Sequence, residues 1–257
     1  MRSDPWSPEQ YLRYRKEREE PFYHLLELIR PRPGMRIVDL GCGTGVLTAE
    51  LHRRLEARET VGIDSSESML AGTPSPVPKS LQFLKQEIRD FQGERDFDLV
   101  FSNAALHWVP DHPQLLAQLT EALSVGGQLA IQVPANFDHV SHLAAAEVAQ
   151  EAPFASTLGG YTHPVFVLRP EEYALLLETL GFRKQHVRLQ VYGHHLPSRE
   201  DVFEWLKGSL LTVYERRLPE PLFSEFCRRY RTELSARLED TRPFFFTFKR
   251  ILMWAER

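Results

Sequence analysis

Short apolar runs alternate with helical stripes over the first half of the chain. Leucines spaced three to four positions apart predict helices over residues 46–55 and 114–123. Strands that alternate with such helices are typical of βαβ units and a parallel sheet. The β-prone runs that predict strands are residues 36–40, 60–64, 81–84, 98–102 and 128–133.

The rest of the chain has a more helical pattern. Apolar positions among many charges predict a helix over residues 8–30 and mostly helical structure over 198–240. We therefore expect one α/β domain over 1–257, with an N-terminal helical cap over 1–30 and a helical insertion over 198–242. This insertion would form part of a lid over the ligand site. The remaining expected elements are helices over 141–151 and 170–180 and strands over 186–192 and 244–255.

Composition and charge exclude several classes of protein. Of the 257 residues, 42% are hydrophobic and 26% charged, as in an average soluble globular protein. Lys and Arg number 31 against 35 Asp and Glu, and the net charge of -4 argues against a nucleic-acid partner. The chain has no run of about 18 apolar residues and no secretory signal pattern, so we expect no membrane partner. Cys42 and Cys227 are too few for a disulfide scaffold, which favours a reduced, cytoplasmic setting.

A glycine-rich turn is the most informative local feature. Gly41, Gly43 and Gly45 follow a predicted strand at alternate positions and precede a predicted helix. Glycines let the backbone turn tightly and approach a ligand closely, and the first amides of the helix then face that ligand. Asp64 ends the next predicted strand, where an acid can accept hydrogen bonds from the two hydroxyls of a ribose. The pattern predicts a site for an adenosine-type cofactor.

The segment Asp39-Leu40-Gly41-Cys42-Gly43-Thr44-Gly45 closely resembles the first motif of the class I S-adenosylmethionine-dependent methyltransferases. The resemblance implies a Rossmann-like, seven-stranded, mostly parallel sheet with its last strand antiparallel and helices on both faces. It also implies that the three glycines pass under the methionine and ribose parts of S-adenosylmethionine. In the same comparison Asp39 orients the loop and Asp64 holds the ribose.

Two later segments extend the resemblance. Glu87 and Ile88 stand where the family contacts the adenine, although Glu replaces the usual Asp and lengthens the arm; Glu87 could instead be a solvated acid at a strand end. Asn103 lies at the carboxyl end of a predicted strand, where α/β sheets place their ligands. The cofactor-binding residues expected in this way are Arg18, Asp39, Gly41, Gly43, Gly45, Asp64, Ser65, Met69, Glu87, Ile88, Asn103 and Ala104.

The resemblance to one subfamily, the trans-aconitate 2-methyltransferases, covers nearly the whole chain and thins after residue 145. It rests on the N-terminal segment 6–21, on Leu106 to His112, on Gln132 to Phe137 and on Phe248 to Leu252. The subfamily methylates a carboxylate of a small polycarboxylic acid and yields a monomethyl ester. A carboxylate is ionised at neutral pH, so we expect a positioning mechanism without a catalytic acid or base, and without a metal.

The residues expected to contact the acid substrate also have purely structural explanations. Arg18 could clamp a carboxylate of the cofactor or of the substrate, and Arg250 one of the substrate; both could instead be solvated charges on a helix and a strand. Tyr11 and Tyr14 could close over the cofactor or pack in the core. The substrate-binding residues expected from the resemblance are Tyr11, Tyr14, His107, Trp108, His194 and Arg250. His107 and Trp108 could equally be a capping histidine and a core tryptophan, and His194 a surface histidine.

Two departures from the subfamily leave alternatives open. Thr212 and Glu20 stand where relatives tend to carry arginine, which weakens the assignment of a tricarboxylate but not of methyl transfer. A methyltransferase for another small molecule is the first alternative; N- or C-methylation would use His107 or His194 as base. A cofactor-binding protein without turnover is the second. The sequence leaves the oligomeric state open and is compatible with a monomer.

Overall fold

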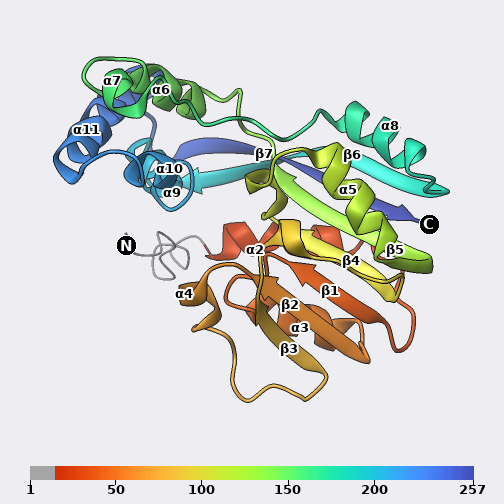
Figure 1. Ribbon diagram of the computed structural model, residues 1–257. Helices are drawn as coiled ribbons and strands as arrows, with labels where there is room; N and C mark the ends of the chain where they lie inside the picture. The colour runs from red at the N-terminus through yellow and green to blue at the C-terminus, as the bar shows by residue number, and fades with distance from the viewer. Residues whose placement is uncertain (1–14) are drawn as a thin grey trace. The chain divides into compact units, whose positions relative to one another are not determined.

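The computed structural model describes residues 15–257, and side chains from residue 19 onward. Seven strands form one sheet in the order β3-β2-β1-β4-β5-β7-β6 (Figure 1). The pairs β1–β2, β1–β4, β2–β3 and β4–β5 are parallel, whereas β7 runs antiparallel to β5. The expected seven-stranded sheet with an antiparallel last strand is confirmed. The strands are β1 Arg36–Leu40, β2 Glu59–Asp64, β3 Leu81–Lys85, β4 Phe97–Asn103, β5 Leu123–Pro134, β6 Lys184–Leu196 and β7 Phe244–Glu256.

Helices connect the strands and account for much of the later chain. The α-helices are α2 Arg15–Leu26, α3 Val46–Arg54, α4 Glu67–Leu70, α5 His112–Glu121, α6 Val140–Ala149, α7 Phe154–Leu158, α8 Pro170–Thr179, α9 Glu200–Lys207, α10 Thr212–Glu215 and α11 Glu220–Arg237. Two 3₁₀ turns, η1 Ile88–Asp90 and η2 Leu106–Trp108, follow β3 and β4. In the described residues no helix has both the length and the apolar character needed to cross a membrane.

The described residues form two compact units. We call Arg15–Pro134, Phe166–Gln190 and Arg250–Arg257 the sheet unit, and Ala135–Val165 with Val191–Lys249 the helical unit. The boundaries fall inside β6 and β7, so each of these strands contributes to both units. The expected insertion 198–242 lies within the helical unit, which also takes in 135–165. Its role as a lid, the cap over 1–30 and the single domain remain predictions.

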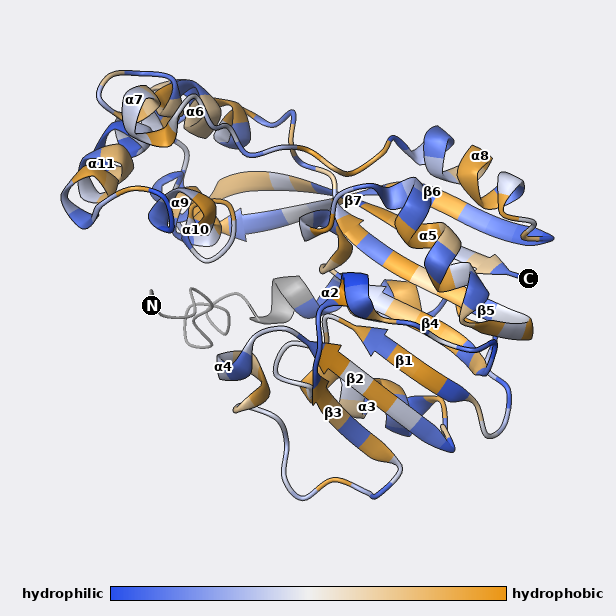
Figure 2. Cartoon of the chain, viewed as in Figure 1, coloured by the Kyte–Doolittle hydropathy of each residue, from blue (hydrophilic) through white to orange (hydrophobic). Residues whose placement is uncertain are grey.

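The core of the sheet unit lies between α2 and the central strands. Phe22 and Leu25 are fully buried against β1, β4 and the end of β7, where Trp254 is 4% exposed. Figure 2 shows the corresponding concentration of hydrophobic residues along β4 and β5. This core packs β1 and β4 together, and the carboxyl ends of the parallel strands β1 to β5 lie at one edge of the sheet.

The structure differs from the sequence prediction at the start of β5. The sequence predicts this strand over residues 128–133, directly after Gly126-Gly127. Instead β5 begins at Leu123, and the register to β4 shifts between Phe97 and Leu99. Gly126, with φ of 72°, lies within this irregularity, so the glycines distort the strand instead of starting it.

Aromatic side chains build the interior of the helical unit. Phe226 of α11 stacks on Tyr214 with ring centroids 4.7 Å apart and meets the edge of Phe154 at 5.4 Å. Tyr230 donates a hydrogen bond of 2.9 Å to the carbonyl of Ser141, which joins α11 to α6. Outside this core, three arginines of α11 pair with glutamates: Arg228 and Arg229 with Glu225, Arg229 with Glu151 and Arg231 with Glu204.

Candidate functional site

The glycine loop joins the end of β1 to the start of α3. Gly41, Gly43 and Gly45 all adopt left-handed conformations, with φ of 77°, 57° and 69°. A Cβ on Gly41 would lie 2.2 Å from Cβ of Ala105, and one on Gly45 would lie 2.4 Å from Cε1 of Phe83. Only glycine meets both the conformation and the close approach. No described side chain caps α3, so its first amides are available to a ligand.

The side chain of Asp39 links the two ends of the glycine loop. The hydroxyl of Thr48 donates a hydrogen bond of 2.6 Å to its carboxylate and ties the strand before the loop to the helix after it. Burial raises the pKa of Asp39 to about 7; the Thr48 hydrogen bond opposes this shift, and the negative charge of Asp64 adds to it. The expectation that Asp39 orients the loop agrees with this geometry.

Asp64 ends β2 beside the same loop. Its two carboxylate oxygens accept hydrogen bonds of 2.8 Å from the amides of Gly43 and Ser66. A carboxylate can accept about four hydrogen bonds, so ribose hydroxyls can bind while both amides still hold the side chain. The main chain thus fixes the orientation of this acid before any ligand binds.

The helix after β2, α4, places one further side chain beside the glycine loop. Ser66, rather than Ser65, caps α4: its hydroxyl accepts a hydrogen bond of 3.1 Å from the amide of Met69. Ser65 is exposed next to Asp64, whereas Met69 is buried with its Cε 3.1 Å from where a Cβ on Gly43 would lie. Met69 therefore packs against the loop.

The segment after β3 places only one of its two expected residues against the loop. Cδ1 of Ile88 lies 3.6 Å from where a Cβ on Gly41 would stand. Glu87 is exposed just before η1, and its side chain makes no capping hydrogen bond. Its contact with adenine remains a prediction.

The end of β4 contributes a buried acceptor. Oδ1 of Asn103 is buried without a hydrogen-bond partner among the described residues. A buried acceptor without a donor is costly, so a donor group on a bound ligand would stabilise it. Ala104 follows with φ of 56°, and Ala105 then packs under Gly41. This orphaned acceptor and the glycine cradle fit the cofactor that the resemblance implies.

The candidate substrate residues of the sheet unit lie on the same edge of the sheet. His107 and Trp108, both half-buried in η2, pack with ring centroids 4.6 Å apart. Arg250 pairs in register with Pro134 at the carboxyl end of β5 and is only 5% exposed. Its guanidinium donates a hydrogen bond of 3.4 Å to Oε1 of Gln132.

Of the other candidates, the structure describes the side chain of His194. His194 belongs to the helical unit, where it is 6% exposed and packs on Trp205 at 4.8 Å and Tyr192 at 6.5 Å. It is therefore not a surface histidine. Tyr11 and Tyr14 lie outside the described residues, as does the side chain of Arg18, although its backbone belongs to α2.

The structure reveals supporting residues that sequence reasoning missed. Thr48, Phe83 and Ala105 each support or contact the glycine loop. A hydroxyl on the first turn of the helix after the loop was a usable signal for Thr48. No local signal marks Phe83 or Ala105, because their contacts depend on the neighbouring strands.

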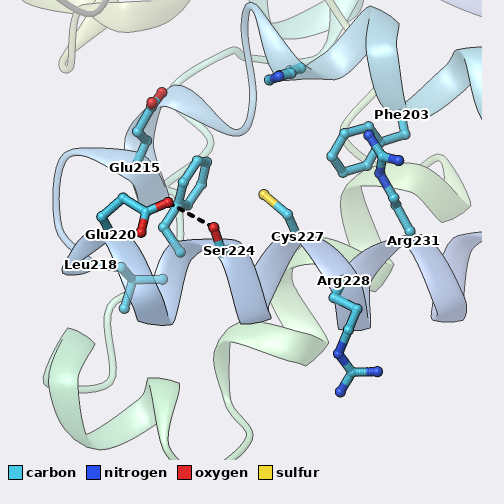
Figure 3. A pocket seen from close by; sticks show the side chains of 10 residues that line it. Phe203, Glu215, Leu218, Glu220, Ser224, Cys227, Arg228 and Arg231 are labelled. Atoms are coloured by element: carbon cyan, nitrogen blue, oxygen red, sulfur yellow. Dashed lines mark hydrogen bonds between the residues drawn. The ribbon is translucent and has the colours of Figure 1, made fainter.

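The helical unit carries a separate pocket of about 750 Å³ (Figure 3). Ser224 and Cys227 project from one face of α11, and the Ser224 hydroxyl donates to Glu220 at 2.8 Å. Burial raises the pKa of Cys227 to about 11 despite nearby Lys207 and Arg231, so the thiol stays protonated at neutral pH. The residues that line the pocket are Phe203, Lys207, Glu215, Leu218, Glu220, Phe223, Ser224, Cys227, Arg228 and Arg231. In the described part of the chain, no group of three His, Cys, Asp or Glu residues could hold a metal ion.

The glycine loop, the acid at the end of β2 and the buried acceptor at the end of β4 meet at one edge of a mostly parallel sheet. They define a Rossmann-like protein with a nucleotide-type cofactor site. Residues 11–187 match the family described as "Methyltransferase domain". The chain belongs to this family.

Comparison with known proteins gives close relatives over the full length. The chain is 42% identical to a protein of Deinococcus radiodurans named trans-aconitate 2-methyltransferase, over 98% of both chains. It is 35% identical to a Mycobacterium tuberculosis protein of the same name, over 98% of this chain and 96% of the relative.

Solved structures agree with the fold. A putative methyltransferase from Bacillus halodurans superposes with a TM-score of 0.58 at 18% identity, over 92% of this chain and 98% of that chain. A phosphoethanolamine N-methyltransferase 2 from Haemonchus contortus, solved with S-adenosylhomocysteine, gives a TM-score of 0.56 at 17% identity, over 93% of this chain and 52% of that chain.

Proposed function

We propose that this protein transfers a methyl group from S-adenosylmethionine to a carboxylate of trans-aconitate and releases the monomethyl ester. The observation that carries this proposal is the 42% identity, over 98% of both chains, to a relative named for that reaction. The glycine loop and Asp64 support the same cofactor independently, because they come from the geometry of the sheet unit.

The chain's own residues account for cofactor binding. Asp64 accepts from the ribose hydroxyls, Ile88 and Glu87 flank the adenine, and Asn103 accepts from a donor of the methionine part. The glycine loop lets the backbone approach, while Ser65, Met69 and Ala104 complete the walls. When bound, the cofactor supplies an electrophilic methyl group on a positively charged sulfur.

Methylation of a carboxylate requires little acid–base chemistry from the protein. The acceptor oxygen is already ionised at neutral pH, so no residue has to remove a proton. The protein instead orients the acceptor and excludes water. Arg250, held by Gln132, is our candidate to bind one carboxylate, with His107 and Trp108 forming a wall. Further candidates for binding the acid are Arg18, Tyr11, Tyr14 and His194.

The two departures from the subfamily bear on how the acid is recognised. Thr212 is 3% exposed, and its hydroxyl donates a hydrogen bond of 2.6 Å to the carbonyl of Ser209. A buried, satisfied threonine cannot replace the charge of an arginine, and Glu20 is exposed. The proposal therefore places more weight on Arg250 than the subfamily pattern alone would.

We also infer the setting and organisation of the protein. Both cysteines are free, and a net charge of -4 disfavours nucleic acid, so we propose a cytoplasmic protein that acts on a small acid. We further propose one domain, with the cap over 1–30 and the insertion 198–242 as part of a lid. A monomer is sufficient for this arrangement.

A methyl-transfer assay with trans-aconitate tests the proposal. Labelled S-adenosylmethionine is incubated with trans-aconitate, cis-aconitate, citrate, isocitrate and a dicarboxylate, and the ester is identified by mass. We expect trans-aconitate to give the highest kcat/KM. Arg250→Gln should raise KM for the acid without weakening S-adenosylhomocysteine binding. The absence of ester from every acid would refute the proposal.

The missing arginine at Thr212 favours one other candidate, a methyltransferase for a different small molecule. Such an enzyme would methylate an uncharged O, N or C acceptor and would need a base, for which His107 and His194 are candidates. Full activity of both His107→Ala and His194→Ala would exclude that role. A protein without turnover would bind S-adenosylhomocysteine in calorimetry and methylate nothing.

A further inference from the structure

A buried chain of hydrogen bonds joins α8 to the turn that follows β4. The amide of Leu168 donates to the hydroxyl oxygen of Tyr173 at 3.3 Å. The Tyr173 hydroxyl contacts Nδ1 of His112, and Nε2 of His112 lies 3.0 Å from the carbonyl oxygen of Leu106. Tyr173 is fully buried and His112 is 2% exposed. All four residues belong to the sheet unit.

The partners and the neutral state of the buried His112 ring together give the direction of each bond. The Leu106 carbonyl can only accept, so Nε2 of His112 must carry a proton. Burial lowers the pKa of His112, although its hydrogen bond to Leu106 opposes the shift, so the ring is neutral and Nδ1 accepts. Tyr173 must then donate to Nδ1 and accept from Leu168; burial raises its pKa and keeps the hydroxyl protonated.

The chain of bonds ends at the turn that carries the candidate acceptor residues. The Leu106 carbonyl also accepts from the amide of Val109 at 2.9 Å, so it lies at the centre of the η2 turn. His107 and Trp108 follow Leu106 directly. Just before it, Ala104 is in the left-handed region and Ala105 packs under Gly41. A strained, tightly packed segment of this kind needs fixed supports to hold one geometry.

We propose that His112 and Tyr173 are positioning residues for methyl transfer, because they hold the 104–109 turn in the geometry that aligns the acceptor. The expected loss of kcat rests on the proposed function, whereas the chain of hydrogen bonds does not. In this role both residues act through the Leu106 carbonyl and not by direct contact with cofactor or acceptor. The chain offers no local signal for the pair, whose members lie 61 residues apart.

Three variants test the role. Tyr173→Phe keeps the ring but removes the hydroxyl that donates to His112 and accepts from the Leu168 amide. His112→Phe removes both ring nitrogens, whereas His112→Gln keeps one donor and one acceptor. We expect kcat to fall roughly 10-fold to 100-fold in the two Phe variants, with partial recovery in His112→Gln. The affinity for S-adenosylhomocysteine should change by less than about 3-fold, since the glycine loop and Asp64 remain in place.

Tyr230→Phe is the matched control. It removes a buried tyrosine hydroxyl of the helical unit that bonds to Ser141, outside the chain of bonds from Leu168 to Leu106. All variants are assayed well below their melting temperatures. If Tyr173→Phe and His112→Phe lose stability to the same extent as Tyr230→Phe but keep the wild-type kcat, the positioning role is wrong.

A spectroscopic measurement separates this inference from the proposed function. Nitrogen-15 NMR of the wild type should show His112 as the neutral tautomer protonated at Nε2, and Tyr173→Phe should shift or split that resonance. A tautomer protonated at Nδ1 would overturn the inference even in an active enzyme. If no acid is methylated, the proposed function fails, while the NMR result still decides whether this chain of bonds exists.

Discussion

The sheet unit and the helical unit achieve order by different means. In the sheet unit the candidate cofactor site is built largely by the main chain: three left-handed glycines and two amides that hold Asp64. In the helical unit, aromatic side chains from α7, α10 and α11 make the interior, and Arg–Glu pairs lie outside it. A site made by the main chain depends on a few local residue types. A core made by side chains depends on packing between distant segments.

The largest effect should come from emptying the helical core. Phe226 is fully buried, and Phe226→Ala should lower the free energy of unfolding by about 3–5 kcal/mol because it leaves a cavity between Tyr214 and Phe154. Denaturant unfolding measures this. Phe245→Ala, at a position 55% exposed, should cost less than about 1 kcal/mol. The affinity of the folded variant for S-adenosylhomocysteine should stay unchanged. A loss of this affinity would show that cofactor binding in the sheet unit depends on the core of the helical unit.

Substitutions in the glycine loop should weaken cofactor binding rather than stability. Gly41→Ala places a Cβ against Ala105 as well as straining the backbone, so we expect affinity for S-adenosylhomocysteine to fall by about 100-fold, or ~2.7 kcal/mol. Gly43→Ala meets only the flexible end of Met69 at 3.1 Å and should lose about 10-fold. Calorimetry measures both, and equal losses would show that the Ala105 contact is not decisive.

The buried acid of the sheet unit should give a pH-dependent effect. Asp39 has a pKa of about 7 in the folded state, whereas an unfolded Asp titrates near about 3.9, so the folded state binds the extra proton between these values. Wild-type stability relative to Asp39→Asn should therefore fall by on the order of 2 kcal/mol from pH 5 to pH 7 and then level off.

Urea unfolding at pH 5, 6, 7 and 8 measures this difference. Asn retains an acceptor for Thr48, so the comparison isolates the charge. A difference in stability that stays constant over this range would mean that Asp39 is ionised in the folded protein throughout.

The smallest effect should come from one hydrogen bond in the helical unit. Tyr230→Phe leaves the Ser141 carbonyl without its tyrosine donor and should cost about 1 kcal/mol of stability. Cofactor affinity should not change. Thermal unfolding gives the stability, and a change of several kcal/mol would indicate that Tyr230 contributes through more than this bond.

The sequence predicted the strands better than the short helices. Alternating apolar runs placed all seven strands, because each strand carries its own pattern. The short helix α7, Phe154–Leu158, was missed, since five residues are too few for a helical period to show. By residue type either Ser65 or Ser66 could cap α4, and only the structure shows that the cap is Ser66.

The sequence by itself was enough to propose the candidate cofactor site. Left-handed turns at alternate positions require glycine, and an acid at a strand end follows from the strand pattern, so Gly41, Gly43, Gly45 and Asp64 were all readable locally.

Only the tertiary structure decided which side chains from distant segments meet. Arg250 beside Gln132 and His112 beside Tyr173 join segments 118 and 61 residues apart. Such contacts depend on strand register and helix packing, which no local pattern encodes.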